Sequence, residues 1–174
     1  MDWYSSIFEV IDMRSFSNLW FWIALAVVWS SASHWVLGVP YDMVTRARRV
    51  GGQAVQDLND IARVNVNRML YIVDVSGIWL LAFSCFILSA LAMSGFFYGI
   101  EFAQAVFLLA FPLTWVALLN LSTARRIRAG ALEGEDLARA LGRCRFFTQI
   151  IGMVAIFFTS LWGMFQNLSI GALG

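Results

Sequence analysis

The sequence predicts an all-α integral membrane bundle of four transmembrane helices, and its composition is the first reason. Of its 174 residues, 60% are hydrophobic and only 13% are charged, whereas ordinary soluble chains have about 45–50% apolar and about 25% charged residues. A water-soluble domain of this size has too much surface to hide so many apolar side chains. We therefore expect lipid to cover most of the surface.

Four uninterrupted apolar stretches are the second reason. They span residues 19–39, 71–94, 102–121 and 146–168, and each is 20 to 24 residues long. At about 1.5 Å per residue, a helix of that length covers the roughly 30 Å of a bilayer core. Backbone polar groups in lipid must be bonded within their own segment, so these stretches are predicted to be helices. The chain is expected to form a single membrane domain over residues 1–174.

The distribution of arginine predicts the orientation of these helices. All twelve basic residues are arginine, and eleven lie in the two segments at residues 40–70 and 122–145. They are Arg46, Arg48, Arg49, Arg63, Arg68, Arg125, Arg126, Arg128, Arg139, Arg143 and Arg145. The positive-inside rule places both segments in the cytoplasm and both termini on the opposite side, in the periplasm or its equivalent. A net charge of only +1 argues against a nucleic-acid partner, because the positive charge is local.

Amphipathic patterns predict helices outside the membrane. Residues 1–18 place apolar side chains at three- and four-residue spacing among acidic ones, which indicates a helix that lies on the membrane surface or docks on a partner protein. A second helix is expected from Gln53 to Arg68, continued by the second apolar stretch. The third helix is expected to extend through Arg125–Arg128 and to break at Gly130 and Gly134.

The two basic segments resemble each other. TRARRVGG at residues 45–52 is similar to TARRIRAG at 123–130, and Asp-Ile-Ala-Arg at 60–63 is similar to Asp-Leu-Ala-Arg at 136–139. Two tandem helix–loop–helix repeats would produce this pattern. Chance is the rival explanation, because alanine and arginine are abundant in the chain.

His34 and Asp74 are the two ionisable residues that lie clearly inside predicted spans. Such residues are costly in a membrane and commonly have a function. Because both lie at a similar depth near the cytoplasmic side, we expect a hydrogen-bonded intramembrane pair that holds two helices together. Two functional alternatives remain open. His34, the sole histidine, could be the axial ligand of a pigment or haem, and Asp74 could carry protons in a small transporter.

Catalytic and metal-binding motifs are absent from the sequence. Cys85 and Cys144 are the only cysteines and do not have the spacing of a redox pair or zinc site. No glycine-rich nucleotide-binding loop is present. We therefore expect no catalytic residue, no metal site and no required cofactor.

Two arginine clusters lie immediately beside predicted spans. They comprise Arg46, Arg48 and Arg49 in the first basic segment and Arg125, Arg126 and Arg128 in the second. Each arginine near a membrane surface attracts anionic lipid by about 1 kcal/mol. Membrane lipids are thus expected partners, and an acidic protein is the alternative.

The opening MDWYSSIFEVIDMRSFSNLWFWIALAVVWS and the following SHWVLGVPYD resemble a family of small alphaproteobacterial membrane proteins labelled as a component of the Suf iron–sulfur assembly complex. The resemblance implies a bacterial inner membrane, with a photosynthetic or respiratory setting. Together with the missing catalytic motifs, it favours a non-catalytic accessory or scaffold subunit of a larger complex. Other membrane subunits or further copies of the chain are the expected partners.

Overall fold

The computed structural model describes residues 15–171, which are almost entirely helical. The α-helices of this part of the chain are α2 (Leu19–His34), α3 (Tyr41–Val50), α4 (Gln53–Ala92), α5 (Glu101–Gly130) and α6 (Gly134–Gly171). The remaining elements are a 3₁₀ turn η1 (Ser15–Ser17), an antiparallel hairpin of β1 (Trp35–Val36) and β2 (Val39–Pro40), and a π-helical turn η2 (Met93–Phe97). The predicted all-α class is confirmed.

Three helices are long and apolar enough to cross a membrane: α4 with its extension through η2, α5, and α6. The fourth, α2, has 16 residues and therefore a length of only about 24 Å. The prediction of a helix over residues 19–39 was wrong at its end, because residues 35–40 form the hairpin. Leu37 and Gly38 adopt positive φ angles of 55° and 72° at the turn of this hairpin, so the chain reverses direction there and the helix cannot continue.

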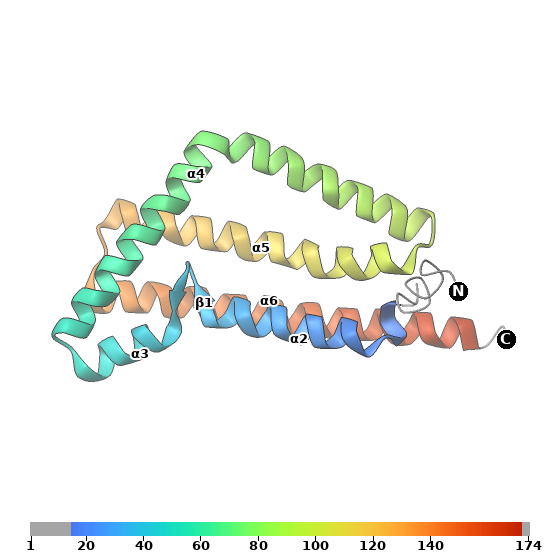
Figure 1. The fold of residues 1–174 in the computed structure, drawn as a ribbon, viewed down its shortest axis with the longest axis horizontal. Helices are drawn as coiled ribbons and strands as arrows, with labels where there is room; N and C mark the ends of the chain where they lie inside the picture. Colours follow the sequence, from blue (N-terminus) through green and yellow to red (C-terminus); the bar gives the residue numbers. More distant parts are fainter. Residues whose placement is uncertain (1–14, 172–174) are drawn as a thin grey trace, which may run out of the picture.

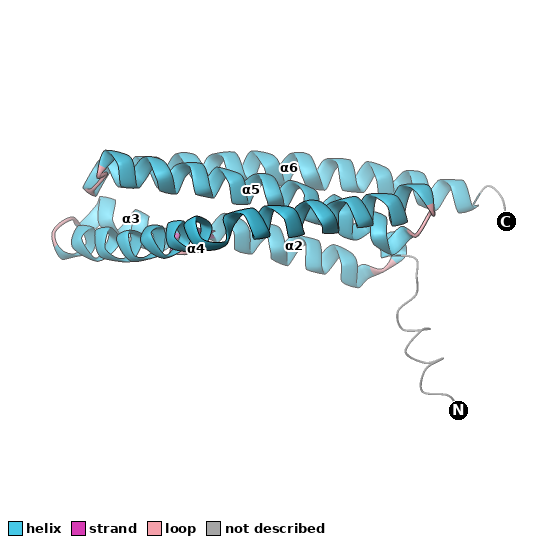
Figure 2. Cartoon of the chain, turned by 90° about the horizontal axis from the view of Figure 1, so that it is seen from above, coloured by secondary structure: helices cyan, strands magenta, loops and turns pink. Residues whose placement is uncertain are grey.

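The apolar helices form an open row. Helix α4 packs on α5, α5 on α6, and α6 on α2. Figure 1 shows α5 between the second half of α4 and helix α2, and Figure 2, turned by 90°, shows α5 and α6 together along one side. Helices α4 and α2 lie at the two ends of this row.

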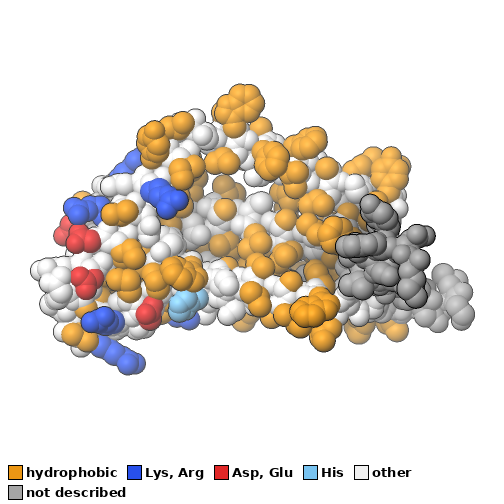
Figure 3. Space-filling model, in the orientation of Figure 1, with side chains coloured by type: hydrophobic (Ala, Val, Ile, Leu, Met, Phe, Trp, Pro, Cys, Tyr) orange, Lys and Arg blue, Asp and Glu red, His pale blue; other side chains and the backbone are white. Residues whose placement is uncertain are grey.

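Two hydrophobic cores lie at different levels of this row. The larger one, here called the basic-end core, joins the hairpin, α3, the first half of α4, the end of α5 and the start of α6. The smaller one, the apolar-end core, consists of Leu25 and Trp29 of α2, Val116 of α5 and Ala155 of α6. Arginine and acidic side chains gather at the end of the molecule that contains the basic-end core, and apolar side chains are scattered over the middle of the face, where charged ones are absent from view (Figure 3).

Helix α4 belongs to the basic-end core over only half of its length. Its buried residues are Ala54, Leu58, Ala62, Val66 and Leu70, which recur every four positions and so share one face. We refer to residues 53–70 as the amphipathic half of α4 and to residues 71–92 as its apolar half. The prediction that the helix from Gln53 to Arg68 continues into the second apolar stretch is confirmed, because α4 is continuous. Figure 1 shows a bend between the two halves.

The two basic segments end helices in different contexts. Residues 45–52 close the short helix α3, whereas residues 123–130 close the long helix α5. The matching tetrapeptides form equivalent ion pairs, Asp60–Arg63 at 2.9 Å and Asp136–Arg139 at 2.6 Å. The tandem repeat stays a hypothesis. Of the helix predicted over residues 1–18, residues 1–14 lie outside the described part of the chain.

Candidate functional site

His34 is the last residue of α2 and is exposed. Its ring meets the ring of Trp35 edge-on, with 5.9 Å between the ring centroids. Among the residues that the structure describes, His34 has no hydrogen-bond partner. Both ring nitrogens are thus available, but neither of the two hollows described below includes His34.

Asp74 does not pair with His34. Its Oδ2 atom lies 3.7 Å from Nη1 of Arg128, with both side chains more than half exposed. We predicted the pair on the expectation that the first two apolar helices, which one basic segment joins, are neighbours. Instead the hairpin, α3 and the amphipathic half of α4 separate them, and α2 packs on α6 while α4 packs on α5. The described residues thus show no contact between His34 and Asp74, and Asp74 joins α4 to α5 instead.

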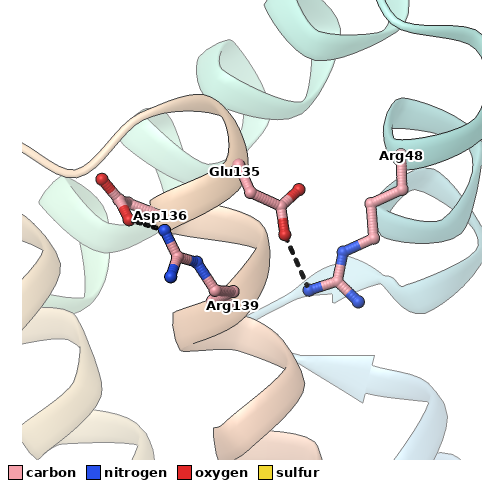
Figure 4. A network of polar contacts seen from close by, with 4 residues as sticks. All are labelled: Arg48, Glu135, Asp136 and Arg139. Atoms are coloured by element: carbon pink, nitrogen blue, oxygen red, sulfur yellow. Dashed lines mark hydrogen bonds and ion pairs between the residues drawn. The ribbon is translucent and has the colours of Figure 1, made fainter.

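Two of the six predicted lipid- or partner-binding arginines have carboxylate partners. Arg128 pairs with Asp74, and Arg48 of α3 lies 3.6 Å from Glu135 in the first turn of α6. Figure 4 shows Arg48 and Glu135 turned toward each other, beside the pair of Asp136 and Arg139. Carboxylates in a first turn also interact favourably with the positive end of the helix dipole. Arg48 thereby ties α3 to the start of α6.

The other four predicted arginines are exposed and form no ion pair within the described residues. They are Arg46, Arg49, Arg125 and Arg126. Long arginine side chains without a protein partner at the edge of an apolar surface can contact phosphate groups of lipid. These four therefore fit the predicted role better than Arg48 and Arg128.

Arg145 is a candidate that the sequence reasoning did not single out. Its guanidinium lies over the ring of Tyr41, with Cζ 3.9 Å from the ring centroid. Such cation–π contact holds the planar group in place. The Nε atom of Arg145 is buried without a hydrogen-bond acceptor among the described residues. No sequence signal links Tyr41 to Arg145, because only the fold brings α3 and α6 together.

A polar cluster at the opposite end of the row was also missed. Gln104 is buried, its Nε2 donates to the carbonyl of Gly95 at 2.8 Å, and its Oε1 accepts from Trp162 at 2.9 Å and from Gln166 at 2.7 Å. A Cβ added at Gly95 would lie 2.8 Å from the backbone nitrogen of Gln104. Gly95 is therefore needed for close packing, and the cluster fastens the end of α4 to α5 and α6.

Two hollows complete the candidate sites. The first, of about 280 Å³, lies at the basic end between the amphipathic half of α4 and the α5–α6 turn. Part of its polar lining is engaged internally, since Asp60 pairs with Arg63 and Asn59 accepts from the backbone nitrogen of Gly134 at 2.9 Å. The second, of about 430 Å³, is a groove between α2 and α6. No group of three or more His, Cys, Asp or Glu side chains in the described residues is placed to hold a metal ion.

No protein-family model, curated protein or solved structure matches this chain.

Proposed function

We propose that this chain is a non-catalytic accessory or scaffold subunit of a larger bacterial inner-membrane complex. In this proposal all four apolar helices span the membrane, the arginine-rich end faces the cytoplasm, and both termini face the periplasm. The apolar half of α4 offers the surface for a neighbouring subunit. The arginine distribution and the resemblance described above support the membrane and its orientation.

The burial of the apolar helices is the observation that carries the proposal. The most apolar 18-residue window of α4 has 0% of its residues buried inside the chain, against 22% in α5 and 28% in α6. Moreover, α4 contributes no residue to the apolar-end core. Helices associate in membranes through side-chain packing rather than through a hydrophobic driving force. Helix α4 packs on α5, yet no residue of its apolar half is buried inside the chain. That half is therefore suited to pack against another chain.

The outward face of α4 is rich in aromatic side chains. Trp79, Phe83 and Phe86 are 76%, 63% and 69% exposed and lie within two helical turns of each other. Aromatic rings supply large contact area at low conformational cost, and they are enriched in the cores of protein interfaces. The face is thus better suited to a protein neighbour than a purely aliphatic one would be.

The shortness of α2 is compatible with a fourth span. A helix shorter than the bilayer core can be accommodated by local thinning of the bilayer. The hairpin that follows it has Val36, Leu37 and Val39 buried, and non-helical backbone is tolerated at membrane depth where protein covers it. We therefore include α2 among the proposed spans.

Native mass spectrometry after gentle detergent extraction from the source membranes tests the proposal. The expected spectrum contains the chain bound to at least one further membrane subunit at fixed stoichiometry. A monomer that carries only lipids would contradict it. Isotope-labelled purified chain, added after extraction, is the control, because a complex formed only in detergent would incorporate the label.

A pigment- or haem-binding role is a second candidate, favoured by the two ring nitrogens of His34 that lack protein partners. Imidazole nitrogen is a common ligand for haem iron. A visible absorbance band that the purified chain shows and a His34→Ala variant lacks would support this role. A colourless preparation from native membranes would reject it.

A further inference from the structure

The groove between α2 and α6 lies just inside the arginine-rich end. Trp29, Ser30 and Ser33 of α2 line one side, and residues 148–156 of α6 line the other. Its volume of about 430 Å³ is within the range of small-molecule sites, roughly 300–1,000 Å³. The groove is therefore large enough to receive part of a lipid.

Glycine and serine create this groove. A Cβ at Gly152 would lie 2.8 Å from Cε3 of Trp29, so glycine lets the indole ring pack directly on the backbone of α6. Trp29 is 6% exposed and forms the floor. Ser30 and Ser33 are too small to fill the space above it. Larger residues at these positions would close the groove.

The groove is polar at one end and apolar at the other, as a phospholipid is polar at its headgroup and apolar along its acyl chains. At the end near the arginines, Nε2 of Gln149 donates to Oγ of Ser33 at 3.2 Å. Further along α6, Met153 and Ile156 present exposed apolar side chains. Arg145 lies one helical turn beyond Gln149, on the basic side. The distance from Arg145 to Ile156 along α6 is about 16 Å, enough for a headgroup, the ester linkages and the first part of an acyl chain.

Arg145 lies one helical turn from Gln149 at the basic end of the groove and has no carboxylate partner among the described residues. None of the ion pairs among the described residues involves Arg145. Its neighbour Arg48, in contrast, is matched by Glu135. The Nε of Arg145 is also buried without an acceptor among the described residues, and a buried donor without an acceptor is costly. A guanidinium without a carboxylate partner favours a ligand that carries phosphate oxygens.

We propose that this groove binds one anionic phospholipid. Its phosphate oxygens accept hydrogen bonds from the guanidinium of Arg145, which Tyr41 holds in position. Its glycerol ester region lies beside Ser33 and Gln149, and one acyl chain follows Gly152 and Ile156 over the indole of Trp29. The site does not depend on the proposed subunit role, since it lies between α2 and α6 and not on α4.

Lipid titration of the purified full chain, followed by native mass spectrometry, tests the site. Phosphatidylglycerol is compared with phosphatidylcholine of the same acyl chains, and glycerol 3-phosphate serves as a soluble phosphate without chains. One phosphatidylglycerol should bind with higher affinity than any further lipid. Phosphatidylcholine should bind more weakly, and glycerol 3-phosphate should not displace the lipid. Equal binding of both lipids would overturn the proposal, as would displacement by glycerol 3-phosphate.

Substitutions in and near the groove test whether the lipid binds there. Arg145→Gln should weaken the first phosphatidylglycerol about fivefold or more, the value of one arginine at a membrane surface. Arg143→Gln removes the same charge from an exposed position on the same helix. It should change the binding affinity less than twofold, because salt screens exposed charges. Ser30→Leu keeps the charge but fills the groove, so it should weaken both lipids. Equal effects of Arg145→Gln and Arg143→Gln would contradict the assignment. If Arg145→Gln does not fold, unchanged lipid binding in Ser30→Leu would contradict it.

Discussion

The two halves of α4 have similar lengths but opposite relations to the rest of the chain. The amphipathic half buries a residue every four positions, with Leu58 at 0% exposure, whereas the apolar half buries none. In water, apolar side chains gain free energy by leaving solvent, so a single apolar stripe folds the helix onto a core. In lipid that gain is absent. The basic-end core therefore holds this fold together, whereas the packing of the apolar half of α4 depends on its surroundings.

Substitution of Leu58 should give the largest loss of stability. Leu58→Ala opens a cavity in the basic-end core and should lower the free energy of unfolding by about 3 kcal/mol. Phe83→Ala in the apolar half removes a larger side chain, yet it should cost less than about 1 kcal/mol because its site is exposed within the chain. Unfolding of both variants in the same detergent measures the contrast. Equal losses would mean that the two halves do not differ in packing.

Gln104 should give an intermediate loss, because it fixes the far end of the apolar half. Gln104→Leu leaves the carbonyl of Gly95 and the indole N–H of Trp162 without the partner seen here. Each such buried group costs about 1–3 kcal/mol. Gln149→Leu removes a single exposed hydrogen bond to Ser33 and should cost about 0.5–1 kcal/mol at most. Thermal unfolding in lipid-free detergent compares them. A larger loss of stability for Gln149→Leu than for Gln104→Leu would contradict the stabilising role of the polar cluster around Gln104.

Asp74 lies where the two halves of α4 meet and should give the smallest effect. Its pair with Arg128 is long and exposed, so Asp74→Asn should change stability by less than about 1 kcal/mol. Added salt should reduce even that difference, because it screens exposed charges. Unfolding at low and high ionic strength checks both statements. A loss of several kcal/mol would indicate a desolvated ion pair.

Proton flux that requires Asp74 would favour the transporter alternative over the subunit role.

Much of the helical framework could be predicted from sequence, because it follows from local patterns. The amphipathic pattern from Gln53 to Arg68 indicated the amphipathic half of α4. The predicted breaks at Gly130 and Gly134 mark the last residue of α5 and the first of α6. The end of α2 was predicted wrongly. Residues 35–39 are apolar whether they continue a helix or fold into a hairpin, so hydropathy cannot separate the two structures.

The candidate sites were less predictable, because depth in a membrane does not determine which helices are neighbours. His34 and Asp74 lie at similar predicted depths, but they belong to opposite ends of the helix row. Arg145 and Tyr41 are distant in sequence and meet only because α3 packs on α6. The groove over Trp29 depends on Gly152, whose importance is visible only from the 2.8 Å approach of the indole ring.

Site-specific photo-crosslinking in native membranes tests the central claim most directly, namely that the apolar half of α4 contacts another chain. A photoreactive residue replaces Phe83 of α4 or, as a matched control, Phe157 of α6, which is similarly exposed at 60%. We predict a discrete protein adduct from position 83, at higher yield than from position 157. Lipid adducts alone from both positions, or equal protein adducts, would contradict the account.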